Sequence, residues 1–229
     1  MHMVENKKSP YANGWGLIGG NPELRKKRQR TPTFEHQYLV DPYEEPTNFE
    51  QIRSFLADHP IEVEIGFRRG HFLRERSVQC PERRFLGFEL TLEWCRKMVR
   101  FLEREDVTNT RIIQSDARPL LEQTLPKNGV DAFYVFFPDP WWKKRHHKRR
   151  LVTAETLDLF HQYLSDDGTF VFRTDVIPYF DHVCELLEQH GGFHVQTPES
   201  PDLALPRSHR EKKCAELGVE TVSLQATLK

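Results

Sequence analysis

The stretch VDAFYVFFPDPW, residues 130–141, decides the fold of this chain. Its first eight residues, Val130 to Phe137, are almost all apolar, which is typical of a strand buried at the centre of a parallel sheet. The strand gives way to Pro138, Asp139 and Pro140, so two residues with restricted backbones flank a carboxylate at its end. We therefore expect a parallel sheet with an acidic turn at the end of a central strand.

Strand and helix patterns alternate on both sides of this stretch. Strands are expected at 61–65, 84–89, 111–114 and 169–173 and near 193–197 and 220–228, and helices at 47–56, 72–79, 91–103, 153–164 and 177–189. Such alternation predicts an α/β fold, with a mostly parallel sheet covered by helices on both faces. The last two strands follow one another without a helix, which indicates an antiparallel edge. We expect Asp166 to Gly168 to form a turn.

The chain has 229 residues, enough for one domain and a tail. Residues 1–46 contain five prolines and little periodicity, and we interpret them as an extended segment that is mobile unless RNA or the domain orders it. Residues 47–229 form the expected folded domain.

The composition also bears on where the protein works. The sequence has no apolar run long enough to span a membrane, and its N-terminus lacks the apolar core of a secretory signal. Its four cysteines are widely spaced, which favours free thiols in a reducing compartment over disulfides or a zinc site. We expect a cytoplasmic protein without a metal, either a monomer or a homodimer.

A net charge of -1 conceals two strongly basic runs, at residues 25–30 and 143–150. A looser arginine cluster comprises Arg68, Arg69, Arg74 and Arg76. Local positive patches on a nearly neutral protein indicate a face for a polyanion such as RNA. A solvated surface is the alternative interpretation of any single run.

Each of the five parallel strands brings a carboxylate or a glycine loop to the same edge of the predicted sheet. These residues are Glu64, Gly66 and Gly70 at the first strand, then Glu89, Asp116, Asp139 and Asp175 after the following strands. Ligands of open α/β sheets bind at this edge, where Glu89 would accept hydrogen bonds from a ribose diol and Asp116 would meet an adenine. Gly66 and Gly70 would let the backbone approach the ligand. The loop lacks the G-x-G-x-x-G pattern, which disfavours a nicotinamide oxidoreductase.

The sequence FPDPWWKKRHHKRR, residues 137–150, resembles the central motif of the TrmB-type tRNA (guanine-N7-)-methyltransferases. The resemblance extends to 64–67, 87–89, 173–175 and the tail from Ser208 to Gly218. It implies a class I, Rossmann-like methyltransferase that uses S-adenosylmethionine, releases S-adenosylhomocysteine and modifies tRNA in the variable loop. The implied donor contacts are Glu64, Glu89, Asp116 and Asp139, and the implied substrate contacts are Lys143, Asp175 and Ser208 to Glu211.

Asp139 is the expected catalytic residue. Guanine N7 carries a lone pair and no proton, so methylation needs alignment rather than a strong base. A carboxylate beside the purine would stabilise the positive charge that develops as the methyl group transfers. Trp141 and Trp142 would either stack on an unpaired base or pack beneath the loop, and the neighbouring cations would hold phosphates.

Two positions depart from the family pattern. Arg68 stands where the family has the middle glycine of its loop, and Arg210 stands where the family has an aromatic residue. These changes leave open an alternative, a non-catalytic RNA-binding relative that has lost the donor because of its altered loop. The two hypotheses differ in whether the protein binds S-adenosylmethionine.

Overall fold

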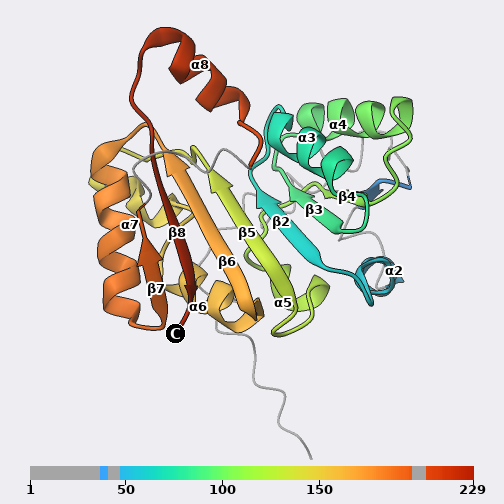
Figure 1. Cartoon of the computed structure of the whole chain (residues 1–229), viewed down its shortest axis with the longest axis horizontal. Helices are drawn as coiled ribbons and strands as arrows, with labels where there is room; N and C mark the ends of the chain where they lie inside the picture. Colours follow the sequence, from blue (N-terminus) through green and yellow to red (C-terminus); the bar gives the residue numbers. More distant parts are fainter. Residues whose placement is uncertain (1–36, 41–46, 198–204) are drawn as a thin grey trace, which may run out of the picture. The chain divides into compact units, whose positions relative to one another are not determined.

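A computed structural model describes residues 37–40, 47–197 and 205–229. Its described residues build an eight-stranded sheet in the order β1-β4-β3-β2-β5-β6-β8-β7 (Figure 1). The strands are β1 (Leu39–Val40), β2 (Ile61–Ile65), β3 (Arg84–Phe88), β4 (Thr110–Ile113), β5 (Val130–Phe136), β6 (Leu164–Thr174), β7 (Phe193–Gln196) and β8 (Val222–Leu228). Strands β1 to β6 pair in parallel, whereas β8 runs antiparallel to both β6 and β7. The predicted mostly parallel sheet with an antiparallel edge is confirmed.

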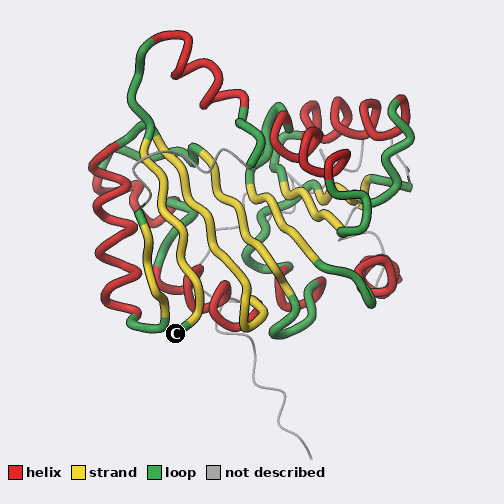
Figure 2. Tube along the Cα trace, viewed as in Figure 1, coloured by secondary structure: helices red, strands yellow, loops and turns green. Residues whose placement is uncertain are grey.

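Helices cover both faces of this sheet (Figure 2). They are α2 (Thr47–Leu56), α3 (His71–Gln79), α4 (Leu92–Arg104), α5 (Leu121–Thr124), α6 (Ala154–Tyr163), α7 (Ile177–His190), α8 (His209–Leu217) and the 3₁₀ helix η2 (Lys144–Arg149). Side chains of a strand alternate between its two faces, so neighbours on β5 point to opposite layers. Accordingly, the Phe133 ring stacks on Phe160 of α6, and the Tyr134 ring packs on Phe72 of α3. The apolar run that predicted a central strand is thus buried from both sides.

Several features differ from the sequence prediction. Asp166 to Gly168 belong to β6 rather than to a turn, and the register between β5 and β6 shifts beside them. A Cβ on Gly168 would lie 2.7 Å from the Val130 carbonyl oxygen, so only glycine fits there. Leu39 and Val40, from the expected N-terminal segment, pair with β4, and helix α8 was not predicted. The division at residue 47 remains a prediction.

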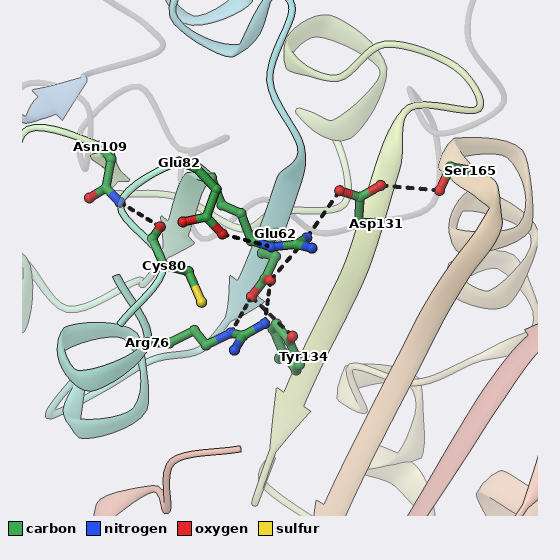
Figure 3. A network of polar contacts seen from close by, with 9 residues as sticks. Glu62, Arg76, Cys80, Glu82, Asn109, Asp131, Tyr134 and Ser165 are labelled. Carbon is green, nitrogen blue, oxygen red and sulfur yellow. Dashed lines mark hydrogen bonds and ion pairs between the residues drawn. The ribbon is translucent and has the colours of Figure 1, made fainter. Parts of the chain in front are cut away.

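A buried carboxylate on β2 fixes α3 against the sheet (Figure 3). Glu62 is 1% exposed and accepts hydrogen bonds from Arg76 Nε at 2.9 Å and Nη2 at 2.7 Å. The Tyr134 hydroxyl donates to Glu62 at 3.0 Å. Arg83 Nη1 lies between two carboxylates, 3.3 Å from Glu62 and 3.2 Å from Asp131. Burial, together with the charge of Glu62, raises the pKa of Tyr134 and keeps it a donor. This network orients the helix that begins directly after the β2 loop.

Candidate active site

The carboxyl ends of β2 to β6 meet at one edge of the sheet, as the parallel pairing requires. After β2 the chain passes to β3 on one side, and β5 lies on the other side of β2. The crevice of an open α/β sheet forms where the strand order reverses in this way. The predicted glycine loop after β2 and the predicted Asp139 turn after β5 therefore flank the same switch point.

The loop after β2 keeps a left-handed backbone at three positions. The φ angles are 81° at Gly66, 45° at Arg68 and 64° at Gly70. A Cβ on Gly70 would lie 2.0 Å from Met98 Cε, whereas a Cβ on Gly66 would meet open space. Open space beside the Gly66 backbone and the close packing of Gly70 fit a loop that admits a ligand on one side only.

Arg68 adopts the conformation that a glycine favours at its position. A left-handed residue with a Cβ costs about 1–2 kcal/mol, and the hydrogen bond from Arg68 N to Glu89 Oε2, 3.0 Å long, offsets part of that cost. The Arg68 side chain is exposed. The substitution therefore retains the turn of the loop.

Glu89 is 8% exposed at the end of β3. Its Oε2 accepts from Arg68 N and its Oε1 accepts from Thr91 N at 2.8 Å. Thr91 does not cap α4 through its own side chain. Each carboxylate oxygen has a second lone pair, so Glu89 retains the capacity to accept from a diol.

Glu64 is buried beneath the same loop, with 3% of its surface exposed. Burial raises the pKa of Glu64 to about 8, repulsion from Glu89 adds to the rise, and a hydrogen bond from the Leu73 backbone opposes it. Its Oε2 has no hydrogen-bond partner among the described residues. A buried polar atom without a partner is costly, and the amino group of S-adenosylmethionine is a donor that would satisfy it. The residues present therefore fit this donor.

Arg118, which sequence reasoning missed, and Arg150, which was expected as a phosphate contact, connect Asp116 to the Asp139 loop. Arg118 pairs with Asp116 through Nε at 3.0 Å and Nη2 at 2.5 Å, and its Nη1 donates to the Arg150 carbonyl oxygen at 3.3 Å. Arg150 Nε donates in turn to the Pro140 carbonyl oxygen at 2.9 Å. Asp116 is thus oriented by Arg118, and the two loops are coupled. The sequence alone gives little indication of the contact between Asp116 and Arg118, because an Asp-x-Arg spacing is common on protein surfaces.

The loop that carries Asp139 has an unusual backbone on both sides. Phe137 and Trp141 have φ angles of 51° and 47°, a region that bulky side chains rarely adopt. Phe137 N donates to the Arg173 carbonyl oxygen at 2.7 Å, which ties the loop to β6. Asp139 itself is exposed. Strain of this kind concentrates at functional sites, and here it surrounds an accessible carboxylate.

The two tryptophans after Asp139 have different environments. Trp141 is half-buried, with Arg149 Cζ 5.0 Å from its ring centroid and the His146 ring 5.8 Å away. Trp142 is 69% exposed. Trp141 therefore packs within the loop, and Trp142 remains available to a ligand. Lys143 is also exposed, and it precedes η2.

The predicted substrate residues of the tail are held by one another. Ser208 caps α8 by accepting from Glu211 N, and the Glu211 carboxylate accepts from Ser208 N, which completes a capping box. The Glu211 carboxylate also accepts from Arg173 Nη1 at 3.0 Å, and both side chains of this pair are at least 95% buried. Asp175, after β6, forms an ion pair with Arg210 of α8. The structure thus brings these residues together at the end of β6.

Helix α8 also contacts α3 (Figure 1). The rings of His209 and His71 lie 4.8 Å apart, and Lys212 forms an ion pair with Glu75. Burial lowers the pKa of both histidines, and nearby cations add to the effect. Helix α8 therefore contacts both α3, which follows the β2 loop, and Asp175, which follows β6.

The described residues contain neither a cluster of acidic, histidine and cysteine side chains suited to a metal ion nor a helix long and apolar enough to cross a membrane.

Comparisons with known proteins agree with this geometry. A family model with the description "Putative methyltransferase" matches residues 58–224. The tRNA (guanine-N(7)-)-methyltransferase of Nitrosococcus oceani is 34% identical over 202 residues, which cover 85% of each chain. The solved 16S rRNA methyltransferase KamB superposes with a TM-score of 0.58 at 15% identity, over 80% of this chain and 93% of that one. A Streptococcus mutans methyltransferase in complex with SAH has a TM-score of 0.51 at 11% identity, over 81% and 99%. These two structures show a methyltransferase fold.

Proposed function

The chain belongs to the family of the tRNA (guanine-N(7)-)-methyltransferases, and on this premise we propose that it methylates a guanine in the variable loop of tRNA. It is an S-adenosylmethionine-dependent enzyme that transfers a methyl group to N7 of guanine in tRNA and releases S-adenosylhomocysteine. One observation carries the assignment to this chain's own residues: the glycine loop after β2 and the Asp139 loop after β5 flank the switch point of the sheet.

The donor site comprises the residues at the ends of β2 to β5. S-adenosylmethionine supplies an electrophilic methyl group on a positively charged sulfur. Glu89 would accept hydrogen bonds from the ribose, and Asp116, oriented by Arg118, would face the adenine. The remaining contacts would come from Glu64, from the backbone between Gly66 and Gly70, and from Asp139.

Asp139 is the proposed catalytic residue. The lone pair of N7 is available without deprotonation, so the enzyme contributes mainly by alignment. The hydrogen bonds from Phe137 N to Arg173 and from Arg150 to Pro140 restrain the backbone on both sides of Asp139. Its carboxylate would stabilise the positive charge that passes to the purine during transfer.

The proposed substrate contacts fall into two groups. Lys143 is exposed and would bind a phosphate, and Asp175 would accept from the N1–H and amino group of guanine. For that contact Arg210 must first leave Asp175. Ser208 and Glu211 act by fixing α8 beside Asp175, because their polar atoms are already engaged with each other and with Arg173.

The non-catalytic alternative depended on Arg68 and Arg210. The left-handed conformation of Arg68 and its exposed side chain support donor binding, because Arg68 adopts the backbone that a glycine favours and its side chain points to solvent. Arg210 lies against Asp175 at the periphery and is 53% exposed. We further propose a cytoplasmic location, where tRNA substrates occur, for a monomer or a homodimer.

The test is methyl transfer from labelled S-adenosylmethionine to an unmodified tRNA transcript, with the product nucleosides identified by mass spectrometry. We expect 7-methylguanosine from the wild-type protein and a loss of at least a hundredfold in Asp139→Asn. Asp166→Asn, an exposed aspartate on β6, is the matched control and should retain full activity. Undiminished turnover in Asp139→Asn would refute the catalytic assignment, and mapping the modified nucleotide would test the variable loop.

A further inference from the structure

Helices α3 and α4 and the loop before them carry cations that have no role in the proposed reaction. We define the α3–α4 basic face by six residues: Arg68, Arg69, Arg74, Lys97, Arg100 and Arg104. All are exposed except Arg74, which is half-buried. The two helices lie side by side beside the carboxyl ends of β2 and β3 (Figure 1). The face therefore begins in the donor loop and extends away from it along α4.

Several of these cations lie over aromatic rings. Lys97 Nζ is 4.3 Å from the centroid of the Trp94 ring, and Arg69 Cζ is 5.4 Å from the same centroid. Arg74 Cζ is 4.8 Å from the centroid of the Phe101 ring. Such contacts hold long side chains in place and reduce the entropy lost when they bind a ligand.

A hollow of about 390 Å³ opens between the two helices. Its lining residues are His71, Arg74, Glu75, Val78, Gln79 and Phe101. Its floor is largely apolar, and Val78 is 56% exposed. An aromatic and apolar floor bordered by arginine is the combination that binds unpaired nucleotides, because bases stack on the floor and phosphates meet the cations.

The carboxylates beside this face are engaged in ion pairs: Glu75 of α3, which lines the hollow, pairs with Lys212, and two others pair with cations of the face itself. Glu93 pairs with Lys97 at 2.6 Å, and Glu105 pairs with Arg104 at 2.7 Å. All four side chains are between 44% and 70% exposed, and exposed pairs of this kind contribute about 0–1 kcal/mol. Phosphates can therefore replace the carboxylates at little cost.

The basic run at 143–150 offers fewer phosphate contacts than its composition indicates. Arg150 donates inward to Pro140, and its guanidinium lies 4.9 Å from the centroid of the Tyr179 ring. Arg149 also lies over a ring, that of Trp141, but it is exposed and stays available to a phosphate. The α3–α4 basic face would add further phosphate contacts near the donor loop.

We propose that the α3–α4 basic face binds an unpaired segment of the substrate tRNA next to the reacting guanine, with its phosphates on the cations and a base in the hollow. The inference rests on the proposed function, because it assigns a binding surface for that substrate. It places RNA on the flank of the donor loop opposite to the one that carries Asp139.

The test measures tRNA affinity as a function of salt concentration for two matched double variants. Arg100→Gln with Arg104→Gln removes two charges from the face and keeps good helix formers. Lys127→Gln with Lys229→Gln removes two exposed charges at the amino edge of the sheet, beyond the ends of α5 and β8. Each phosphate contact with unpaired nucleic acid contributes about 0.7 to the slope of log affinity against log salt. We expect the slope to fall by about 1.4 in the first variant and to stay unchanged in the second.

A second comparison uses Val78, which lines the hollow. Val78→Glu should weaken tRNA binding severalfold more than Val78→Gln, because only the glutamate repels phosphates. Donor affinity measured by calorimetry should be unchanged in all four variants, which verifies folding. Equal slopes in the two double variants, or equal binding by the two Val78 variants, would overturn the inference. If the wild-type protein formed no 7-methylguanosine, the proposed function would fail instead, and the salt slopes would still report on the face.

Discussion

Replacement of Glu211 by glutamine separates a structural role from direct substrate contact. Arg173 and Glu211 are 2% and 5% exposed, and their atoms lie 3.0 Å apart. Arg173 Nε and Nη2 have no hydrogen-bond partner among the described residues, so the variant leaves a buried guanidinium without its counter-charge. Breaking a buried pair in this way costs about 3–5 kcal/mol.

This cost predicts a large thermal effect. A change of 1 kcal/mol shifts Tm by about 2–4 °C in a protein of this size, so Glu211→Gln should lower Tm by about 6–20 °C if α8 unfolds with the domain. If α8 detaches by itself, Tm falls less, and hydrogen exchange of residues 209–217 accelerates instead. Differential scanning calorimetry and amide exchange measure the two outcomes.

Two controls make the result decisive. Glu216→Gln changes an exposed carboxylate of the same helix, paired with Lys213, and should alter stability by less than about 0.5 kcal/mol. The double variant Arg173→Met with Glu211→Leu should recover much of the lost stability, because it removes both charges. An unchanged Tm and unchanged exchange in Glu211→Gln, with a raised KM for tRNA, would refute the reasoning and make Glu211 a substrate ligand.

Three further predictions follow from other contacts. Burial raises the pKa of Glu64 to about 8 from 4.5, so the folded protein without its donor binds a proton that the unfolded chain has released between these values. The free energy of unfolding should therefore fall by on the order of 3 kcal/mol from pH 5.5 to 8.5. Urea titrations should show that it depends less on pH in Glu64→Gln. Glu62→Gln should lower the free energy of unfolding by about 3–5 kcal/mol, measured by urea titration, because the amide removes the counter-charge of Arg76 and accepts only one of its two hydrogen bonds. A loss below about 1 kcal/mol would contradict this. Arg210→Ala frees Asp175 and should lower the KM for tRNA about two- to fivefold at constant kcat, whereas a raised KM would show that Arg210 itself binds substrate.

The sheet was predictable because its strands are apolar and its helices alternate with them. The five acidic or glycine-containing strand ends were predictable for the same reason, since parallel strands share an edge. Helix α8 was not, because it is mostly polar and depends on a capping box and on contacts with α3 and β6. Strand β1 has two residues, too few for a pattern, and its pairing with β4 defines it.

The ion pairs of the predicted polar residues could not be predicted from the sequence. The sequence shows that residues 175 and 211 are carboxylates, but it does not reveal that arginines from distant segments already pair with Asp175 and Glu211. Trp141 and Trp142 are adjacent and chemically identical. The structure distinguishes them, because Trp141 has a left-handed backbone and packs within the loop, whereas Trp142 is exposed.

The position of β8 has a consequence for how the protein assembles during synthesis. β8 lies between β6 and β7, although it follows both in the chain. Until Val222–Leu228 has left the ribosome, β6 presents an unpaired edge and β7 lacks its neighbour. Unpaired edges promote association between nascent chains. We therefore expect ribosome-bound chains that stop before β8 to recruit chaperones more strongly than released chains, even though the donor loop and Asp139 are already in place.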